Sequence, residues 1–554
     1  MQAGLNLVFV FVLGILYGQS LGFWPFDVAA EQEILYPDYP DTSAKRIAII
    51  GAGAAGSSTA WHLQRFAARS EIPINITVFE RASYVGGRST TVNAYDDPLT
   101  PVELGASIFV EVNTILKNSS ELFGLKPRDS DTENTEILGI WNGEKFVYTQ
   151  KEGGWYWLDV AKLIWKYGLA PIRTQRLMKS TVGKFQKLYA APFFPFRSLS
   201  DRVLDLDLVS ATSMTGEQLL AASNIGSAFA TDIIQASTRV NYGQNLGFIH
   251  GLETMVCMAI EGAMQIEGGN WQIFDGMLKA SNATILLNTT VDEIKKSKNA
   301  YSVKTSSRDA SSGIIQSKEE PFDTVVLAGP LQYSGIHIEE GLLKHTPDEI
   351  PYVTLHVTLF TSTHTLNRVF FNLAPDAEVP TTILTTLPPN EVPVDPEDGA
   401  GSIGFFSIST LRTVVNPKTL EKEHLYKIFS PQKVTSEFLS DILGVPIPTN
   451  LSSINVDSGD AISWYYPHVW NPYPYEFPRV TFEELELARG FYYTSGIESF
   501  ISTMETSALM GMNVAQLIVD DYLQILEDKV DHSEETPLQV ALSEKQKDVE
   551  VQEL

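Results

Sequence analysis

Three glycines stand where an apolar run meets a helix-forming segment. In RIAIIGAGAAGSSTAWHL, residues 46–63, they occupy positions 51, 53 and 56. The first glycine permits a tight turn, the second lets backbone approach a pyrophosphate, and the third lets helix and strand pack closely. Amides at the start of the following helix would face the phosphates. The pattern predicts a dinucleotide site that contains Gly51, Gly53, Ala54, Ala55 and Gly56.

The elements around this turn have the order that such a site requires. The predicted strand Arg46–Ile50 is apolar at every position after Arg46, as buried parallel strands are. A helix is predicted from about 55 to 70, and a second strand over Asn75–Glu80. Glu80 lies 24 residues after Gly56, where an acid that binds a ribose hydroxyl is expected. The alternative is a glycine turn in an unrelated α/β protein, but the strand, the helix and the terminal acid together favour the dinucleotide site.

A second glycine pair follows in RASYVGGRSTT, where Gly86 and Gly87 precede Arg88. An acid followed shortly by Gly-Gly-Arg resembles the flavoprotein amine-oxidase superfamily. The resemblance implies that Arg88 lies at the pyrophosphate of FAD, and the Glu80–Arg81 pair fits the same pattern. It predicts an α/β (α+β) fold in which a Rossmann-type FAD-binding domain of the GR2, amine-oxidase-like type carries an inserted substrate domain of mixed sheet and helices.

The same resemblance places cofactor contacts in further segments. ELGAS, residues 103–107, would pass beside the flavin, and Val291 in VDEI would meet the adenine through its backbone. The helix that begins near Thr503 and Met504 would point amides at the flavin pyrimidine, where they stabilise negative charge on the reduced ring. The contacts expected in these segments are Gly105, Ala106, Ser107, Val291, Gly496, Thr503 and Met504.

The cofactor site therefore draws on both ends of the chain, with a substrate domain between them. Glu505 is interpreted as a helix N-terminal acid rather than a catalyst. We expect an FAD-binding domain from 45–140, 265–335 and 481–527, a mainly helical substrate domain over 141–264, its second part over 336–480, and a disordered tail over 528–554.

A closer resemblance, to the prenylcysteine oxidase (prenylcysteine or farnesylcysteine lyase) family, covers nearly the whole chain after the leader. It rests on ILGIWNGEKFVY (137–148), LIWKYG (163–168), RVNYGQN (239–245), IEGGN (266–270) and YYTSGIES (492–499). The resemblance implies non-covalently bound FAD and a prenylcysteine substrate, farnesyl- or geranylgeranylcysteine. The thioether would be cleaved with O₂ and water to cysteine, a prenyl aldehyde and hydrogen peroxide.

This chemistry asks little of acid or base side chains. Hydride loss from an allylic carbon bonded to sulfur leaves a stabilised cation, so no catalytic residue is assigned with certainty. The candidates are Arg239, Tyr242 and Glu267. Arg239 could hold the substrate carboxylate or be structural and pair with an acid; Tyr242 and Gln244 share that ambiguity. Glu267 could lie near flavin or substrate. Aromatic residues of 141–264 either line an apolar tunnel or form ordinary core.

Composition excludes some classes of partner. The formal net charge of −27 argues against nucleic acid, whose phosphates require Lys and Arg. We find no metal-spaced Cys/His cluster and no Ser-His-Asp arrangement, so no metal is predicted. The single cysteine, Cys257, is interpreted as a buried small hydrophobe rather than a flavin attachment point. The resemblance implies a prenylcysteine and O₂ as partners, and peripheral lipid contact is expected at a surface that the sequence does not locate.

The first 22 residues have the layout of a secretory signal peptide, although no Lys or Arg precedes the apolar stretch. An uncleaved membrane anchor is the alternative.

Asn75 stands in a glycosylation sequon within a predicted strand. We expect localisation in the secretory pathway, either lysosome or vacuole or secreted. The sequons expected to carry glycans are Asn118, Asn282, Asn288 and Asn450.

Two other functions share this scaffold. A polyamine or other amine oxidase would need acids or an aromatic cage for a cationic substrate. A secreted lipid-binding protein could keep the fold without catalysis. Intact FAD motifs at both ends of the chain argue against the second alternative, because a protein without catalysis has no need of them.

Overall fold

The computed structural model describes residues 44–128, 136–151, 156–308, 314–451, 454 and 461–534. The predicted signal peptide over 1–22 lies outside these residues. Helix α14 (Met504–Glu534) continues past position 528, where the disordered tail was expected to begin. The helix overlaps the first residues of the predicted tail, because the chain has no Gly or Pro between Glu527 and Pro537 to stop it, and disorder of the tail stays a prediction. The rest of the tail lies outside the described residues.

A six-stranded sheet forms the first layer. Its order is β18-β19-β11-β1-β2-β7, and all neighbours are parallel except β18 and β19. Ile47, Ala48 and Ile49 of the central strand are completely buried, as their apolar run predicted. The strands are β1 (Lys45–Ile50), β2 (Ile74–Phe79), β7 (Thr284–Leu286), β11 (Thr324–Leu327), β18 (Glu486–Ala488) and β19 (Phe491–Tyr493).

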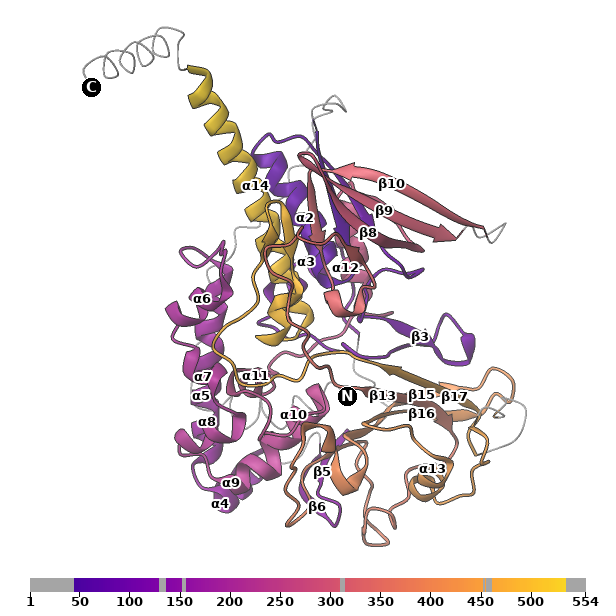
Figure 1. Cartoon of the computed structure of the whole chain (residues 1–554). Helices are drawn as coiled ribbons and strands as arrows, with labels where there is room; N and C mark the ends of the chain where they lie inside the picture. Colours follow the sequence, from indigo (N-terminus) through magenta and orange to yellow (C-terminus); the bar gives the residue numbers. More distant parts are fainter. Residues whose placement is uncertain are drawn as a thin grey trace, which may run out of the picture.

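The two ends of the described chain pack together on this sheet (Figure 1). Helix α2 (Ala54–Arg69) follows the glycine turn, and α14 lies against it. A Cβ atom at Gly511 would stand 2.3 Å from the Ala55 carbonyl oxygen, so the backbones approach as closely as glycine allows. The Ser58 hydroxyl donates to the Ala508 carbonyl at 2.6 Å. The predicted union of the chain ends is confirmed. Two further helices, α3 (Thr114–Leu122) and α12 (Trp271–Ala280), complete this layer.

Two small sheets adjoin the large one. The ring of Tyr301 on the four-stranded sheet packs edge-on against Phe491 of the first sheet. The four strands, ordered β10-β9-β8-β12, are β8 (Thr289–Ser297), β9 (Ala300–Arg308), β10 (Ile315–Phe322) and β12 (His337–Ile338). The two-stranded sheet consists of β3 (Thr91–Asn93) and β4 (Pro101–Glu103).

A further, seven-stranded sheet has the order β17-β13-β16-β15-β14-β5-β6. Its core includes Phe360, Phe405 and Ile428, and α13 (Ser436–Leu443) packs there. The chain enters this sheet at β5, ahead of the boundary expected at 140. The strands are β5 (Ile137–Trp141), β6 (Phe146–Lys151), β13 (Leu355–Ser362), β14 (Thr382–Thr385), β15 (Ser407–Val415), β16 (Lys422–Ser430) and β17 (Trp464–Trp470).

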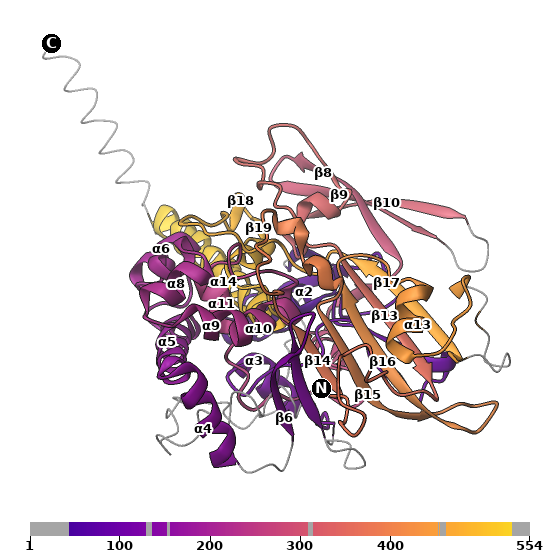
Figure 2. The same ribbon diagram turned by 90° about the horizontal axis from the view of Figure 1, so that it is seen from below.

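A group of helices stands beside this sheet (Figure 2). It occupies the rest of the segment that was predicted to be mainly helical. The helices are α4 (Tyr156–Tyr167), α5 (Ala170–Phe185), α6 (Leu199–Asp205), α7 (Val209–Ser213), α8 (Gly216–Ala222), α9 (Ser227–Phe229), α10 (Gln235–Tyr242) and α11 (Gly251–Val256).

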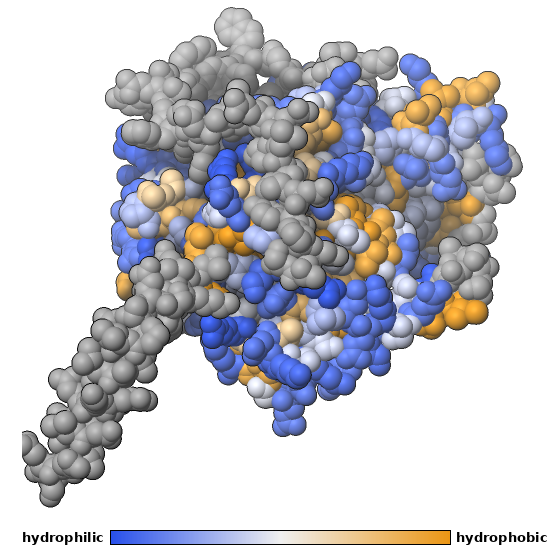
Figure 3. Space-filling view, turned by 90° about the horizontal axis from the view of Figure 1, so that it is seen from above, coloured by the Kyte–Doolittle hydropathy of each residue, from blue (hydrophilic) through white to orange (hydrophobic). Residues whose placement is uncertain are grey.

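The surface is mixed in character. Seen from above, hydrophilic residues are interspersed with separate hydrophobic patches (Figure 3). Among the described residues, no helix combines the length and the apolar character that crossing a bilayer demands.

Candidate functional site

The carboxyl ends of the parallel strands meet at one edge of the six-stranded sheet. Ile50 at the end of β1 is in register with both Phe79 and Leu327. The segments that follow these strands therefore emerge side by side, which is where open α/β sheets bind ligands. The glycine turn and Glu80 are two of these segments.

The glycine turn leaves no space for side chains at two of its positions. Gly51 has φ +109°, and a Cβ there would lie 2.8 Å from the Ala328 carbonyl oxygen. A Cβ at Gly56 would lie 1.9 Å from the Gly51 carbonyl oxygen. The third glycine thus lets the first turn of α2 pack on the turn itself. Ala54 and Ala55 open that helix, and their amides precede the first intrahelical hydrogen bonds.

Glu80 directly follows β2 and binds the turn from the side. Its Oε2 accepts the Ala52 amide at 2.8 Å, and its Oε1 accepts the Ala82 amide at 2.7 Å. Each oxygen keeps a second lone pair, so the carboxylate can still accept a ribose hydroxyl. The neighbouring Arg81 turns outward, where its guanidinium donates to the Tyr333 carbonyl at 2.9 Å.

The second glycine pair lies directly on the first motif. The Gly86 amide donates to the Ala52 carbonyl at 2.9 Å. A Cβ at Gly87 would stand 3.2 Å from the Gly53 Cα, so the two backbones are in contact. We call residues 51–56, Glu80 and 86–88 the phosphate end of the site. Two glycine-lined backbones with a helix N-terminus are suited to a pyrophosphate.

Arg88 connects this end to the C-terminal part of the chain. Its two guanidinium Nη atoms donate to the two carboxylate oxygens of Glu498, both at 2.7 Å. Glu498 also accepts the Tyr352 hydroxyl at 3.1 Å, and it lies in a short 3₁₀ helix, η8 (Ser495–Ser499). The Arg88 side chain remains 37% exposed. Its expected contact with the pyrophosphate stays a prediction, while its fork-like pairing with Glu498 is what the structure shows.

The segment 103–107 lies against the seven-stranded sheet. A Cβ at Gly105 would meet the Trp470 ring at 2.5 Å, so only glycine fits there. Lys427, on β16, reaches this segment: its Nζ donates to the Glu103 carbonyl at 2.7 Å and to the Ser107 hydroxyl at 3.0 Å. Ala106 lies between these contacts.

Lys427 and Glu103 are both buried, and burial shifts their pKa values toward each other. Burial lowers the pKa of Lys427 to about 7 and raises the pKa of Glu103 to about 7. Lys427 was not among the residues predicted from the sequence. The available signal was a lysine inside EHLYKIFS, an otherwise largely apolar strand.

The IEGGN segment contributes a different residue from the one expected. Glu267 is exposed, so its predicted position near flavin or substrate has no support from the structure. Asn270 is completely buried instead. Its amide donates to Glu103 Oε1 at 2.7 Å, and its Nδ2 donates to the Ala106 carbonyl at 2.8 Å. The motif thus positions the 103–107 segment through Asn270. We call residues 103–107, 499–505 and Lys427 the ring end of the site, after the flavin ring that was predicted to lie beside 103–107 and the start of α14.

The N-terminus of α14 is capped by its own residues. Thr503 and Thr506 exchange hydrogen bonds of 3.1 Å between each amide and the other's hydroxyl. Glu505 reaches another helix: its carboxylate accepts the amides of Ile115 at 2.9 Å and Leu116 at 3.0 Å. Glu505 thus stands in the first turn of α14, as predicted, and its carboxylate also caps the N-terminus of α3. Burial raises its pKa to about 7.

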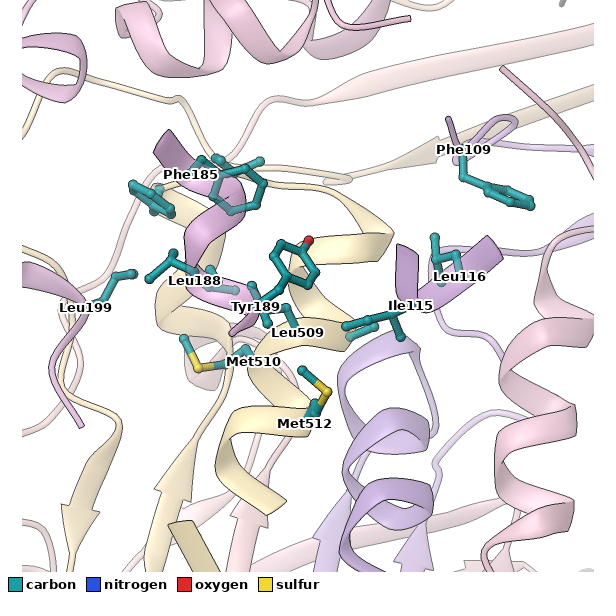
Figure 4. Close-up of a cluster of buried hydrophobic side chains, with 14 of the residues drawn as sticks. Phe109, Ile115, Leu116, Phe185, Leu188, Tyr189, Leu199, Leu509, Met510 and Met512 are labelled. Atoms are coloured by element: carbon teal, nitrogen blue, oxygen red, sulfur yellow. The ribbon is translucent and has the colours of Figure 1, made fainter. Parts of the chain in front are cut away.

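An apolar cluster surrounds this contact. Side chains of α14, including Leu509 and Met510, lie near Ile115 of α3 and Tyr189 (Figure 4). The Tyr189 hydroxyl hydrogen-bonds with Glu505, although burial is the main reason why the pKa of Tyr189 lies well above its usual value.

The RVNYGQN segment holds the polypeptide together rather than presenting free groups. Arg239 is 1% exposed. Its Nε donates to Asn245 Oδ1 at 2.8 Å and its Nη1 to the Thr386 carbonyl at 3.1 Å. Its hydrogen bonds thus go to neutral oxygens, which fits the structural role without the predicted acid. Tyr242 donates to the Ser502 carbonyl at 3.1 Å, and Gln244 accepts the Glu476 amide at 2.9 Å.

Three buried polar residues meet next to the backbone of residues 499–503. His250, Glu253 and Glu476 place ligand-type atoms within 4.8 Å of one another. Burial raises the pKa of Glu253 to about 8, and the nearby Tyr242 hydroxyl and Ser502 amide partly offset this shift. Neither acid makes a side-chain hydrogen bond of normal geometry.

The ring of His250 faces these acids as a donor. His250 Nδ1 accepts the Glu253 amide at 3.0 Å, so a neutral ring carries its proton on Nε2. That nitrogen lies 3.5 Å from Glu476 Oε2. A ring nitrogen that holds a proton is not a metal ligand. The group is therefore a set of buried acids beside a histidine donor. The sequence did not reveal it, because Glu476 lies far along the chain from His250 and Glu253.

The remaining predicted residues, Val291, Gly496 and Cys257, are buried in the protein interior. Val291 is 3% exposed on β8, whose first residue, Thr289, bonds to the Glu80 carbonyl at 2.9 Å. Gly496 is packed so that a Cβ would stand 2.9 Å from the Glu483 Cβ. Cys257 is buried, as expected, and burial raises the pKa of its thiol well above the usual value.

The comparisons with known proteins agree with this geometry. Residues 49–123 match the NAD(P)-binding Rossmann-like domain, and residues 150–532 match the prenylcysteine lyase family. The chain is 27% identical to the farnesylcysteine lyase of Arabidopsis thaliana over 87% of this chain and 90% of that protein. It is 26% identical to human prenylcysteine oxidase 1, over 85% and 88% of the two chains.

Solved structures share the fold. A cyclohexylamine oxidase from Brevibacterium oxydans superposes with a TM-score of 0.51 at 14% identity, over 86% of this chain and 99% of the other. A fatty acid isomerase from P. acnes superposes with a TM-score of 0.51 at 12% identity, over 85% and 98%. The predicted Rossmann-type fold with an inserted substrate domain is confirmed.

Proposed function

The chain belongs to the prenylcysteine lyase family, and we propose that it is an FAD-dependent oxidase that cleaves the thioether of prenyl-L-cysteines. The substrate class follows the names of its relatives, farnesylcysteine lyase and prenylcysteine oxidase 1. One prenylcysteine, one O₂ and one water would yield cysteine, a prenyl aldehyde and hydrogen peroxide.

One observation carries the proposal. Both glycine segments, the terminal acid of β2 and the helix at the end of the chain meet on one side of the same parallel sheet. The glycine contacts leave room only for backbone, and Glu80 keeps free lone pairs for a ribose. These residues fit a dinucleotide that extends from the phosphate end to the ring end.

The cofactor supplies the redox chemistry when it is bound, because a flavin accepts a hydride from a carbon beside sulfur and passes the electrons to O₂. The protein supplies position and electrostatics. Residues 103–107 are held by Asn270 and Lys427, so that backbone segment is rigid. The N-terminus of α14 places the positive end of its helix dipole near Thr503 and Met504. Together these groups favour negative charge at the ring end.

We propose that FAD is held without a covalent bond to cysteine. The only cysteine, Cys257, is buried, and its thiol is therefore kept protonated and unreactive. Acid precipitation of the purified protein should leave the yellow colour in the supernatant. Colour that stays with the pellet would contradict this part of the proposal.

The proposed activity is tested by spectroscopy under anaerobic conditions. The purified protein should be yellow, and farnesylcysteine should bleach its visible absorption band. Readmission of air should restore the band and release hydrogen peroxide. Spermine serves as the control substrate: bleaching by spermine but not by farnesylcysteine would support the amine-oxidase alternative. Colourless protein that binds no FAD would leave only the lipid-binding alternative.

We also propose that the protein enters the secretory pathway and resides in a lysosome-like compartment or outside the cell. The apolar leader over 1–22 supports this location. Exposed sequon asparagines support it too, since glycan transfer requires access. The test is a mass shift on endoglycosidase treatment of protein from cells, together with N-terminal sequencing. An unshifted mass and an intact N-terminus would contradict the proposal. The sequons concerned are at Asn118, Asn282, Asn288 and Asn450.

A further inference from the structure

One pair of helices is basic although the molecule as a whole is acidic. The whole chain carries a net charge of −27, yet residues 156–187, which span α4 and α5, contain seven lysines and arginines and one acid. Arg173, Arg176 and Lys179 are exposed along α5. Positions three apart lie on the same face of a helix, so these cations form a stripe. Arg176 and Lys179 make no hydrogen bond or ion pair within the described residues.

The same region exposes large apolar side chains beside the cations. Trp165 is 92% exposed, Leu169 is 54% exposed and Ile164 is 40% exposed. Trp165 is thus one of the most solvent-exposed large apolar residues of the described chain. Trp and Leu next to Lys and Arg are the composition of helices that lie in a membrane interface.

The arrangement in space allows these side chains to reach a surface outside the protein. Helix α4 projects from the edge of the helical group (Figure 2). Its last turn is fixed to the body by Lys166, whose Nζ bonds to Asp232 at 2.9 Å and to the Val147 carbonyl at 3.0 Å. Trp165 and Leu169 flank this anchor and point away from the core, since both are exposed.

Helix α5 connects this surface with the ring end of the site. It begins one turn after Trp165, and its last residue, Phe185, packs against Phe500 with ring centroids 6.0 Å apart. Phe500 lies within the 499–505 segment. Sixteen helical residues span about 24 Å, so the surface and the ring end lie within the length of a single helix of each other.

We propose that Ile164, Trp165 and Leu169, together with Arg173, Arg176 and Lys179, form a docking surface for a lipid bilayer with anionic headgroups. The apolar side chains enter the headgroup boundary, and the cations pair with the headgroups. Charge complementarity selects this occupant, because this strongly basic stretch lies in an otherwise acidic protein. The advantage for catalysis rests on the proposed function: a prenylcysteine dissolves in membranes, and the enzyme collects it there. The membrane contact itself does not depend on that activity.

Vesicle sedimentation with the flavin-loaded, full-length mature protein tests the proposal without any substrate. The protein should sediment with vesicles that contain 30% phosphatidylserine in phosphatidylcholine, and far less with phosphatidylcholine alone. Each cation near an anionic surface contributes roughly fivefold in binding. R176E/K179E should therefore weaken binding at least about 20-fold, and W165S/L169S at least about 10-fold.

Two control variants have matching changes elsewhere. V392S/V394S removes exposed apolar side chains, of 79% and 88% exposure, from another loop. K304E/K318E reverses two exposed lysines on the four-stranded sheet. Both should bind like the parent protein. Equal losses in the controls, or no binding to anionic vesicles, would overturn the proposal.

Two more measurements distinguish the membrane surface from the proposed activity and from a dimer interface. W165S/L169S should bleach with dissolved farnesylcysteine at the parent rate, but should react slowly with farnesylcysteine carried in anionic vesicles. Vesicle binding by a protein that does not react with farnesylcysteine would contradict the proposed function and leave the docking surface intact. A concentration-dependent dimer that W165S/L169S abolishes, without vesicle binding, would assign the surface to a second copy of the chain and overturn the membrane proposal.

Discussion

The two ends of the cofactor site are built in different ways. At the phosphate end, 51–56 and 86–88 meet through backbone atoms, and Glu80 has hydrogen-bond partners on both oxygens. The ring end instead gathers buried ionisable side chains, among them Glu103 and Lys427, from segments far apart in the chain. The comparison teaches that a phosphate needs close backbone and a helix N-terminus, whereas a ring that changes charge needs positioned charges in a dry interior.

The largest effect is expected at the phosphate end. Gly56→Val would place atoms inside van der Waals distance of the Gly51 carbonyl, because a Cβ alone would already stand 1.9 Å from it. We expect colourless protein that is destabilised by more than about 4 kcal/mol. The measurements are the absorption spectrum and urea unfolding. Gly183→Ala is the control: its Cβ would meet no atom within 4 Å, so it should retain FAD and gain up to about 1 kcal/mol. FAD retention by Gly56→Val would contradict the close-approach argument.

The next effect concerns the connection between the two ends. Arg88→Met leaves Glu498 buried and unpaired, and should lower the free energy of unfolding of the flavin-free protein by about 3–5 kcal/mol. The double variant Arg88→Met/Glu498→Gln removes the lone charge and should recover much of that loss. Its affinity for FAD should stay low if Arg88 also contacts the pyrophosphate. Parent-like affinity in the double variant would restrict Arg88 to a structural role.

Lys427 should make the free energy of unfolding increase with pH. Its pKa falls from 10.5 to about 7 on folding. Between these values the unfolded state binds more protons, so stability should rise with pH by up to about 1.4 kcal/mol per pH unit. Lys427→Met should abolish this rise. Denaturant unfolding at pH 7 to 10 is the measurement, and an unchanged slope in the variant would show that Lys427 is charged in the folded protein.

Glu253 gives an effect of similar size to that of Lys427, with the opposite sign. Its pKa rises from 4.5 to about 8 on folding. The folded state binds more protons between these values, so its contribution lowers stability as pH rises from about 4.5 to 8. Glu253→Gln should flatten that slope, while Asp207→Asn, at an exposed ion pair with Lys184, should leave it unchanged. A slope that is steeper in Glu253→Gln would contradict a neutral, buried carboxyl.

The same contrast determines what the sequence could predict. The phosphate end lies in short motifs whose residues are neighbours in the chain, so Gly51, Gly56 and Glu80 were found from spacing alone. The ring end depends on contacts such as Lys427 with Ser107, which are separated by more than three hundred residues in the chain and leave no local pattern.

In two motifs, the sequence indicated the right segment but not the contacts that its residues make. In EGGN the acid attracted the prediction, yet the buried amide of Asn270 makes the contacts. In RVNYGQN, Arg239 was expected to bind a substrate carboxylate or to pair with an acid, and it binds carbonyls instead. Residue type indicates what a side chain can do, but burial decides which of its partners it meets.

The packing of α14 on α2 also has a consequence for synthesis. The glycine turn leaves the ribosome more than 400 residues before Ala508 and Gly511, which pack against α2 from the far helix. The helical group and the seven-stranded sheet are therefore synthesised while the proposed nucleotide-binding half is still unfinished, and we expect flavin uptake to be a late event in maturation. A truncation within α14 would release a chain whose middle is folded and which has no place for its coenzyme.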